Sequence, residues 1–135
     1  MTTQEAYEQI RAYFSREGAQ LAWDDDLDSC QYCTEDGRRC AVGCLIPAGL
    51  YDQNFEGTNI RSLIDAEHDR KYRDAGTAPN TRAALVDLFA GVDPVFLEKA
   101  QERHDGLAEE DVLATGDFVN RLDLLAEEFH LTVPS

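Results

Sequence analysis

Basic residues are scarce in this sequence. It contains 12 Lys and Arg residues against 27 Asp and Glu, which gives a formal net charge of -15 at neutral pH. Proteins bind nucleic-acid phosphates and anionic membrane surfaces through cationic side chains. We therefore expect neither direct nucleic-acid binding nor membrane binding. Two roles for the charge remain, because it can serve solubility or let an acidic face dock on the basic surface of another protein.

Long apolar runs are missing as well. No run approaches the ~20 residues that cross a bilayer, and the N-terminal stretch MTTQEAYEQI lacks the basic and apolar regions of a signal peptide. These features predict a cytoplasmic protein. The chain has 135 residues, of which 43% are hydrophobic, so we expect a single domain spanning 1–135.

The apolar spacing predicts a mainly helical protein. Thr2 and Glu5 have capping-box spacing, and Ala6, Ile10 and Phe14 then fall on one helical face. Further helices are expected to begin near residues 58–59, 80–81, 93–94 and 117, the third ending at Gly106 and the last running to about 130. We predict an α+β class, namely about four to five helices with one β-hairpin around residues 30–46.

All four cysteines lie in the predicted hairpin, CQYCTEDGRRCAVGC, with the spacing C-x2-C-x6-C-x3-C. Asp36-Gly37 is a strong type I′ turn signal. With a two-residue turn, Cys33 faces Cys40, and side-chain alternation puts these two and Cys44 on one face and Cys30 on the other. A zinc site using all four thiolates would then need a sharp bend before Cys33.

Four roles for the cysteines stay open. The first is a structural zinc site with Cys30, Cys33, Cys40 and Cys44 as ligands. A disulfide between the two facing cysteines is disfavoured in a reducing cytosol, and a nucleophilic thiolate lacks an aligned base. We favour the fourth role, small buried residues, because CAVGCLI is otherwise a continuous apolar stretch. No cofactor is favoured, and zinc is the alternative.

His104-Asp105 is a further candidate site. Some metal-dependent phosphohydrolases use a His-Asp pair, but they draw more His and Asp ligands from other helices. The remaining histidines, His68 and His130, lie in no partner motif. A histidine near a helix end, partly packed and hydrogen-bonded locally, is the favoured interpretation. A hydrolase that uses His104 and Asp105 or a cysteine thiolate remains an alternative, while we expect no enzyme and assign no catalytic residue.

Residues 30–57 carry a motif, C-x-Y…DGRRCAVGCLIP…LYD…FEG, with Gln-x-x-His-Asp downstream. The motif resembles that of a family of small uncharacterised proteins of bacteriophages and bacteria. The matching positions are Cys30, Tyr32, Asp36, Gly37, Cys40, Ala41, Gly43, Leu45, Ile46, Pro47, Tyr51, Glu56, Gly57, Gln101, His104 and Asp105. Ala48 stands where the pattern usually has an acidic residue, and Cys33 and Cys44 are not fixed parts of it. The family has no established activity, so the resemblance implies only a bacterial host cell.

Together these features favour a non-enzymatic accessory protein of phage type. It would bind a host or defence-system protein that has a basic surface, as an anti-defence or host-takeover factor would. The candidate contact residues are the acids of two segments, Asp24, Asp25, Asp26 and Asp28 in WDDDLD, and Glu109, Glu110 and Asp111.

Overall fold

The computed structural model describes residues 1–24, 29–51, 56, 60–64, 79–109 and 115–134. Its longer helices are α1 (Thr3–Ser15), α4 (Pro79–Phe89), α5 (Pro94–Glu109) and α6 (Thr115–Glu128). The shorter elements are β1 (Trp23–Asp24), β2 (Ser29–Cys30), the 3-10 turns η1 (Gly43–Leu45) and η2 (Ala48–Leu50), and α2 (Ile60–Ile64). None of the helices in these ranges is long and apolar enough to cross a membrane.

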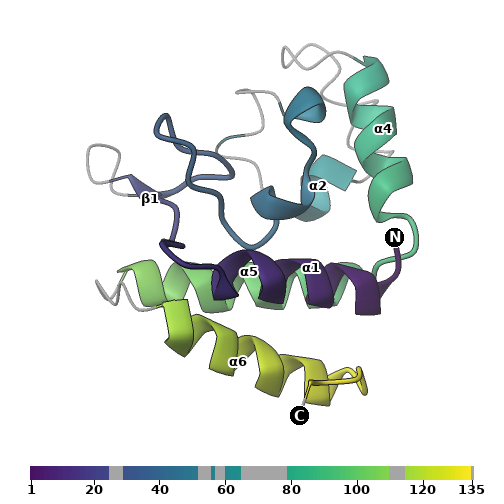
Figure 1. Ribbon diagram of the computed structural model, residues 1–135. Coiled ribbons are helices and arrows are strands. Elements are labelled where there is room, and N and C mark those ends of the chain that lie inside the picture. The colour runs from purple at the N-terminus through teal and green to yellow at the C-terminus, as the bar shows by residue number, and fades with distance from the viewer. Residues whose placement is uncertain (25–28, 52–55, 57–59, 65–78, 110–114, 135) are drawn as a thin grey trace.

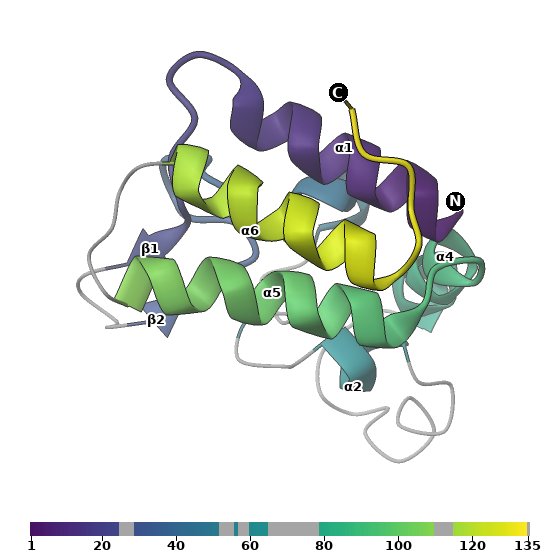
Figure 2. The ribbon, with the colours of Figure 1, turned by 90° about the horizontal axis from the view of Figure 1, so that it is seen from below.

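Helix α6 brings the C-terminal part of the chain against the N-terminal helix α1. It packs against both α1 and α5, and it lies between them in Figure 2. The segment from residue 29 to 51 covers the opposite side of α1 and α5, next to α2 and α4 (Figure 1). The irregular segment that carries the sequence motif is therefore supported on a layer of helices.

Helix α1 begins as the sequence predicts. The Thr2 hydroxyl accepts a hydrogen bond from the Glu5 amide at 3.1 Å, and the Glu5 carboxylate accepts one from the Thr2 amide at 3.0 Å. This confirms the capping box, which stabilises a helix by about 1 kcal/mol. The same helix buries one face, formed by Ala6, Tyr7, Ile10 and Phe14.

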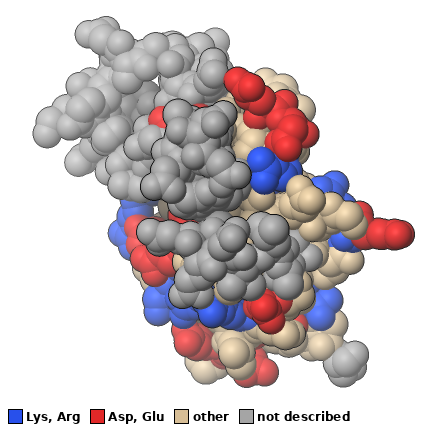
Figure 3. All heavy atoms as spheres, turned by 90° about the vertical axis from the view of Figure 1, so that its left-hand side faces the viewer, with Lys and Arg blue, Asp and Glu red and all other residues tan. Residues whose placement is uncertain are grey.

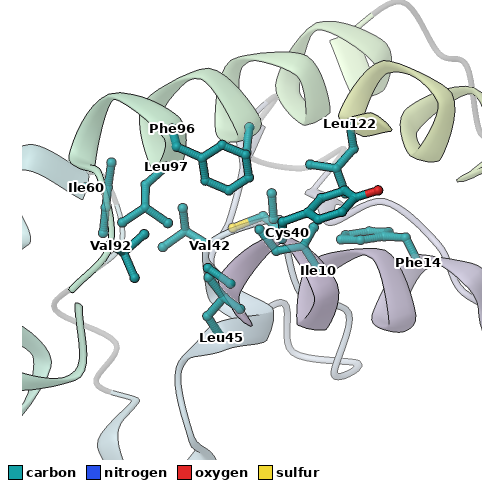
Figure 4. Close-up of a cluster of buried hydrophobic side chains, with 14 of the residues drawn as sticks. Ile10, Phe14, Cys40, Val42, Leu45, Ile60, Val92, Phe96, Leu97 and Leu122 are labelled. Carbon is teal, nitrogen blue, oxygen red and sulfur yellow. The ribbon is translucent and has the colours of Figure 1, made fainter. Parts of the chain in front are cut away.

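The hydrophobic core lies where α1, α5 and α6 meet the 40–46 segment (Figure 4). Phe14, Phe118 and His104 meet there with ring centroids 4.7–5.8 Å apart. Cys40 is 1% exposed, and its sulfur lies among the apolar side chains of the cluster. Each fully buried large side chain contributes about 1.5–3 kcal/mol, so this cluster supplies much of the stability.

The predicted α+β class with a β-hairpin around residues 30–46 is wrong. The described residues form a helical protein, in which β1 and β2 pair over two residues each, Trp23 with Cys30 and Asp24 with Ser29. Within the 30–46 segment, β pairing is a single bridge between Cys33 and Arg39. This bridge also overturns the predicted register, in which Cys33 faced Cys40.

The turn explains the shifted register. A type I′ turn needs positive φ at both central residues. Gly37 has a φ of 89°, but Asp36 is not among the described residues with positive φ. The Gly37 amide donates to the Thr34 carbonyl at 3.0 Å, and the Thr34 amide donates to the Arg38 carbonyl at 2.8 Å. These bonds fit a three-residue loop with a glycine bulge, which moves the pairing by one residue.

The stretch predicted as the second strand is coiled instead. The Cys44 amide donates to the Cys40 carbonyl at 3.0 Å, and η1 follows. The Arg39 guanidinium donates to the carbonyls of Gly43 at 3.3 Å and Ile46 at 2.6 Å. The carbonyl groups of this compact turn therefore accept hydrogen bonds from within the segment, whereas those of a strand would accept them from a neighbouring strand.

Helix α5 begins where the sequence predicts but ends later. Asp93 caps α5 as expected, because its carboxylate accepts from the Val95 amide at 2.9 Å. Gly106, however, lies inside α5, and the helix continues to Glu109. A glycine weakens a helix by only about 1 kcal/mol, which burial of Leu107 offsets. The predicted caps near residue 58 lie outside the described residues.

Candidate functional site

Two motif residues, Tyr32 and Tyr51, and the neighbouring Cys33 all donate hydrogen bonds to the Glu56 carboxylate. Glu56 accepts hydrogen bonds from the backbone amides of Tyr32 at 2.8 Å and Cys33 at 3.2 Å. The Tyr51 hydroxyl donates to the same carboxylate at 2.6 Å, and it also lies 3.4 Å from the Cys33 carbonyl. Hydrogen bonds to a charged acceptor are about twice as strong as neutral ones. Glu56 therefore fastens the chain after η2 to the residues that follow β2.

Gly43 is placed by a close backbone approach. A Cβ atom at this position would lie 1.9 Å from the Tyr32 carbonyl oxygen. Only glycine fits such a contact without moving one backbone segment away from the other. The motif glycine thus serves packing between η1 and the residues after β2.

The turn of the motif is fastened by its own side chains. Asp36 accepts from Arg38 Nε at 3.0 Å and from the Thr34 hydroxyl, and the Arg38 amide donates to the Thr34 hydroxyl at 3.0 Å. These contacts, the Thr34 hydrogen bond above all, hold the pKa of Asp36 below its ordinary value. Of the other motif residues of this region, Cys30 pairs with Trp23 through the backbone and Pro47 precedes η2.

The three cysteines with described side chains are free thiols. Burial raises the pKa of Cys40 to about 12, and its sulfur accepts from the Gly43 amide at 3.2 Å. Burial also raises the pKa of Cys44, whose thiol donates to the Ala41 carbonyl at 3.1 Å. Cys33 is partly exposed. Within the described ranges no three His, Cys, Asp or Glu side chains are placed to hold a metal ion, and the Cys30 side chain lies outside them.

His104 is fully buried and uses both ring nitrogens. Nε2 lies 3.1 Å from the Ala22 amide nitrogen, and Nδ1 lies 3.0 Å from Asp105 Oδ1. Because the Ala22 N–H needs an acceptor, Nε2 carries no proton, so the neutral ring bears its proton on Nδ1 and donates it to Asp105. A hydrolytic histidine must reach its substrate, whereas this ring has 0% exposure.

Gln101 completes the contacts of α5. Its carbonyl oxygen accepts from the Val42 amide at 3.1 Å, and its amide nitrogen donates to Asp105 Oδ1 at 2.6 Å. Asp105 thus orients two neighbours, which in turn hold the backbone at Ala22 and Val42. We call Glu56, Gln101, His104 and Asp105 the polar brace, because they bind the irregular segment to itself and to α5.

Sequence reasoning missed two polar contacts of the irregular segment. Arg39 was given no role beyond its place in the predicted hairpin, yet it caps η1. Tyr13 also escaped notice as a polar group, although its hydroxyl accepts from the Arg39 amide at 3.0 Å. Sequence spacing carries no signal for either contact, because the partners are backbone groups brought together by the turn.

The predicted contact acids are largely beyond what the structure describes. Asp25, Asp26, Asp28, Glu110 and Asp111 lie outside the described residues, and so does Gly57. Asp24 ends β1 and Glu109 ends α5, but their side chains are not described. On the face in Figure 3, the described Asp and Glu side chains are interspersed with Lys and Arg rather than gathered in one patch.

Comparison with known proteins yields no relative: no protein-family model, curated protein or solved structure matches the chain. The resemblance to small bacteriophage and bacterial proteins therefore stays a prediction.

Proposed function

We propose that this chain is a small acidic accessory protein of phage type that acts by binding a host or defence-system protein with a basic surface, without catalysis. The observation that carries the proposal is the net charge of -15. Such a charge steers association toward a basic partner and makes the encounter strongly dependent on salt.

The polar brace supports the same proposal. Its polar atoms are engaged within the molecule, from the Glu56 carboxylate to both nitrogens of His104. Catalysis or ligand binding would need such groups turned toward a substrate. The acids exposed at the surface are the groups that remain for a partner to meet.

The two predicted acidic segments offer a direct test. One variant neutralises WDDDLD by replacing Asp24, Asp25, Asp26 and Asp28 with Asn, and another replaces Glu109, Glu110 and Asp111 with their amides. The control replaces exposed acids of the described helices and turns with Gln, namely Glu8, Glu17, Glu102 and Glu127. The control and the first variant each remove four negative charges, so they separate a local contact from a general charge effect.

The immobilised chain is used to capture proteins from a bacterial host lysate at about 50 mM and about 300 mM salt, where screening lengths differ more than twofold. The affinity of a purified partner for each variant is then measured by calorimetry. We expect capture at the lower salt, and a loss of affinity of at least about tenfold in one segment variant but not in the control. Absence of any partner at low salt, or an equal loss in all three variants, contradicts the proposal.

A further inference from the structure

His104 joins α5 to the chain that leads into β1. Its Nε2 accepts a hydrogen bond from the Ala22 amide at 3.1 Å, although the two residues are 82 positions apart in the sequence. Both Ala22 and the imidazole are buried. An accepting nitrogen carries no proton. The Ala22 hydrogen bond therefore exists only while the ring is neutral.

The groups around the ring define what happens when it gains a proton. Helices α1 and α6 present Phe14 and Phe118, neither of which titrates. Among the described residues, the charge that contacts the ring is Asp105, at Nδ1. The nearby Cys40 thiol and Tyr32 phenol, which interact with Asp105, are neutral in acid as thiols and phenols ordinarily are, and burial raises the pKa of both further.

Protonation changes one side of the ring and leaves the other intact. The Nδ1–H bond to Asp105 persists and gains charge assistance. On the other side, the new Nε2–H points at the Ala22 N–H, so two donors face each other in a buried site. Histidine is the side chain that ordinarily changes charge between about pH 5 and 8.

We propose that His104 is an acid-sensitive latch, whose protonation releases the Ala22 amide and loosens the chain before the β1–β2 pair from α5. This role concerns the fold itself and does not depend on a partner. Two further contacts hold the same chain, because Arg38 donates to the Leu21 carbonyl at 3.2 Å and the Gln31 amide donates to the Ala22 carbonyl at 3.0 Å. The release is therefore local.

The test follows the ring and the amide in one sample. NMR of the ¹⁵N-labelled chain reports the protonation of the His104 imidazole, and hydrogen exchange reports the protection factor of the Ala22 amide. Protection is measured from about pH 7.5 to about pH 5.5, and as the ring gains its proton we expect protection of Ala22 to fall about tenfold, the equivalent of one lost hydrogen bond. The fall should follow the ring titration with the same midpoint.

Two variants serve as controls. His104→Gln offers an amide oxygen as acceptor and does not titrate, so Ala22 protection should no longer depend on pH in this way. His130→Gln removes an exposed histidine at the end of α6 and should behave like the wild type. Should His104→Gln fail to fold, the matching of midpoints in the wild type remains decisive.

The proposal is overturned if Ala22 protection stays constant while His104 titrates, or if His104 remains neutral over the whole range. It is equally overturned if His104→Gln shows the wild-type pH response, or if His130→Gln abolishes it.

Discussion

At the scale of single residues, the motif side chains hold backbone segments in place by hydrogen bonds or close packing, and their polar groups face the protein's own backbone. Gly43 allows two backbone segments to touch, Glu56 binds two consecutive amides, and His104 accepts a third. Unpaired buried amides cost about 1–3 kcal/mol each, so these side chains are needed for the irregular segment to be buried at all. Their pattern in the sequence therefore follows from folding.

A substitution at Gly43 tests the close approach. Gly43→Ala would place a methyl group 1.9 Å from the Tyr32 carbonyl oxygen. Because backbone cannot rotate away as a side chain can, we expect the free energy of unfolding to fall by more than about 3 kcal/mol. Urea denaturation followed by circular dichroism measures it.

The matched control for that substitution is Gly106→Ala, in the interior of α5, where an added Cβ meets no atom within 4 Å apart from its chain neighbours and the nearby backbone of the helix. It should raise the free energy of unfolding by about 0.5–1 kcal/mol, through helix propensity. Equal effects of the two alanines would contradict the close contact between η1 and Tyr32.

At the scale of elements, the sequence predicts the helices far better than the segment between them. Thr2 with Glu5 and Asp93 with Pro94 are local signals, and local hydrogen bonds satisfy them. The turn at residues 35–37 depends on whether one or two residues adopt positive φ, and Asp36-Gly37 is compatible with both. The polar brace depends on contacts across 23–82 residues, which spacing alone does not encode.

The α1–α6 contact provides a prediction at this scale. The Tyr7 hydroxyl donates to Asp123 at 2.6 Å from a buried position, whereas Arg11 pairs with the same carboxylate at 3.0 Å with both side chains partly exposed. Tyr7→Phe should lower the free energy of unfolding by about 1–2 kcal/mol, and Arg11→Gln by less than about 1 kcal/mol.

Urea denaturation of these two variants, of Asp123→Asn and of the two double variants that combine Asp123→Asn with each of them completes a double-mutant cycle for each pair. The coupling energy of Tyr7 with Asp123 should exceed that of Arg11 with Asp123. The opposite order would mean that the ion pair, and not the buried hydroxyl, joins the helices.

At the scale of the whole molecule, the buried weak acids act together. Burial, with a smaller contribution from Asp123, raises the pKa of Tyr7 to about 12, and burial raises that of Cys40 to about 12. The pKa values of Tyr32 and Cys44 shift in the same direction for the same main reason. The native chain thus keeps protons in alkali that the unfolded chain releases.

The sign of the resulting pH dependence is fixed. Stability from these groups is complete below about pH 9, where both states are protonated, and it is lost as the pH rises toward about 12. Each group lowers the free energy of unfolding by at most about 1.4 kcal/mol per pH unit in that window. Urea denaturation at several pH values should show the fall, and Cys40→Ala should reduce its slope. A constant stability up to pH 11 would contradict the burial of these groups.

The central claim is that the motif residues form a polar brace that stabilises the fold. The most direct test is the free energy of unfolding of Glu56→Ala beside that of Glu102→Ala, an exposed acid on α5. Loss of the Glu56 carboxylate leaves two amides and the Tyr51 hydroxyl without this acceptor, so we predict a decrease of about 2 kcal/mol, against less than about 0.5 kcal/mol for Glu102→Ala. A change below about 0.5 kcal/mol in both variants would contradict the claim.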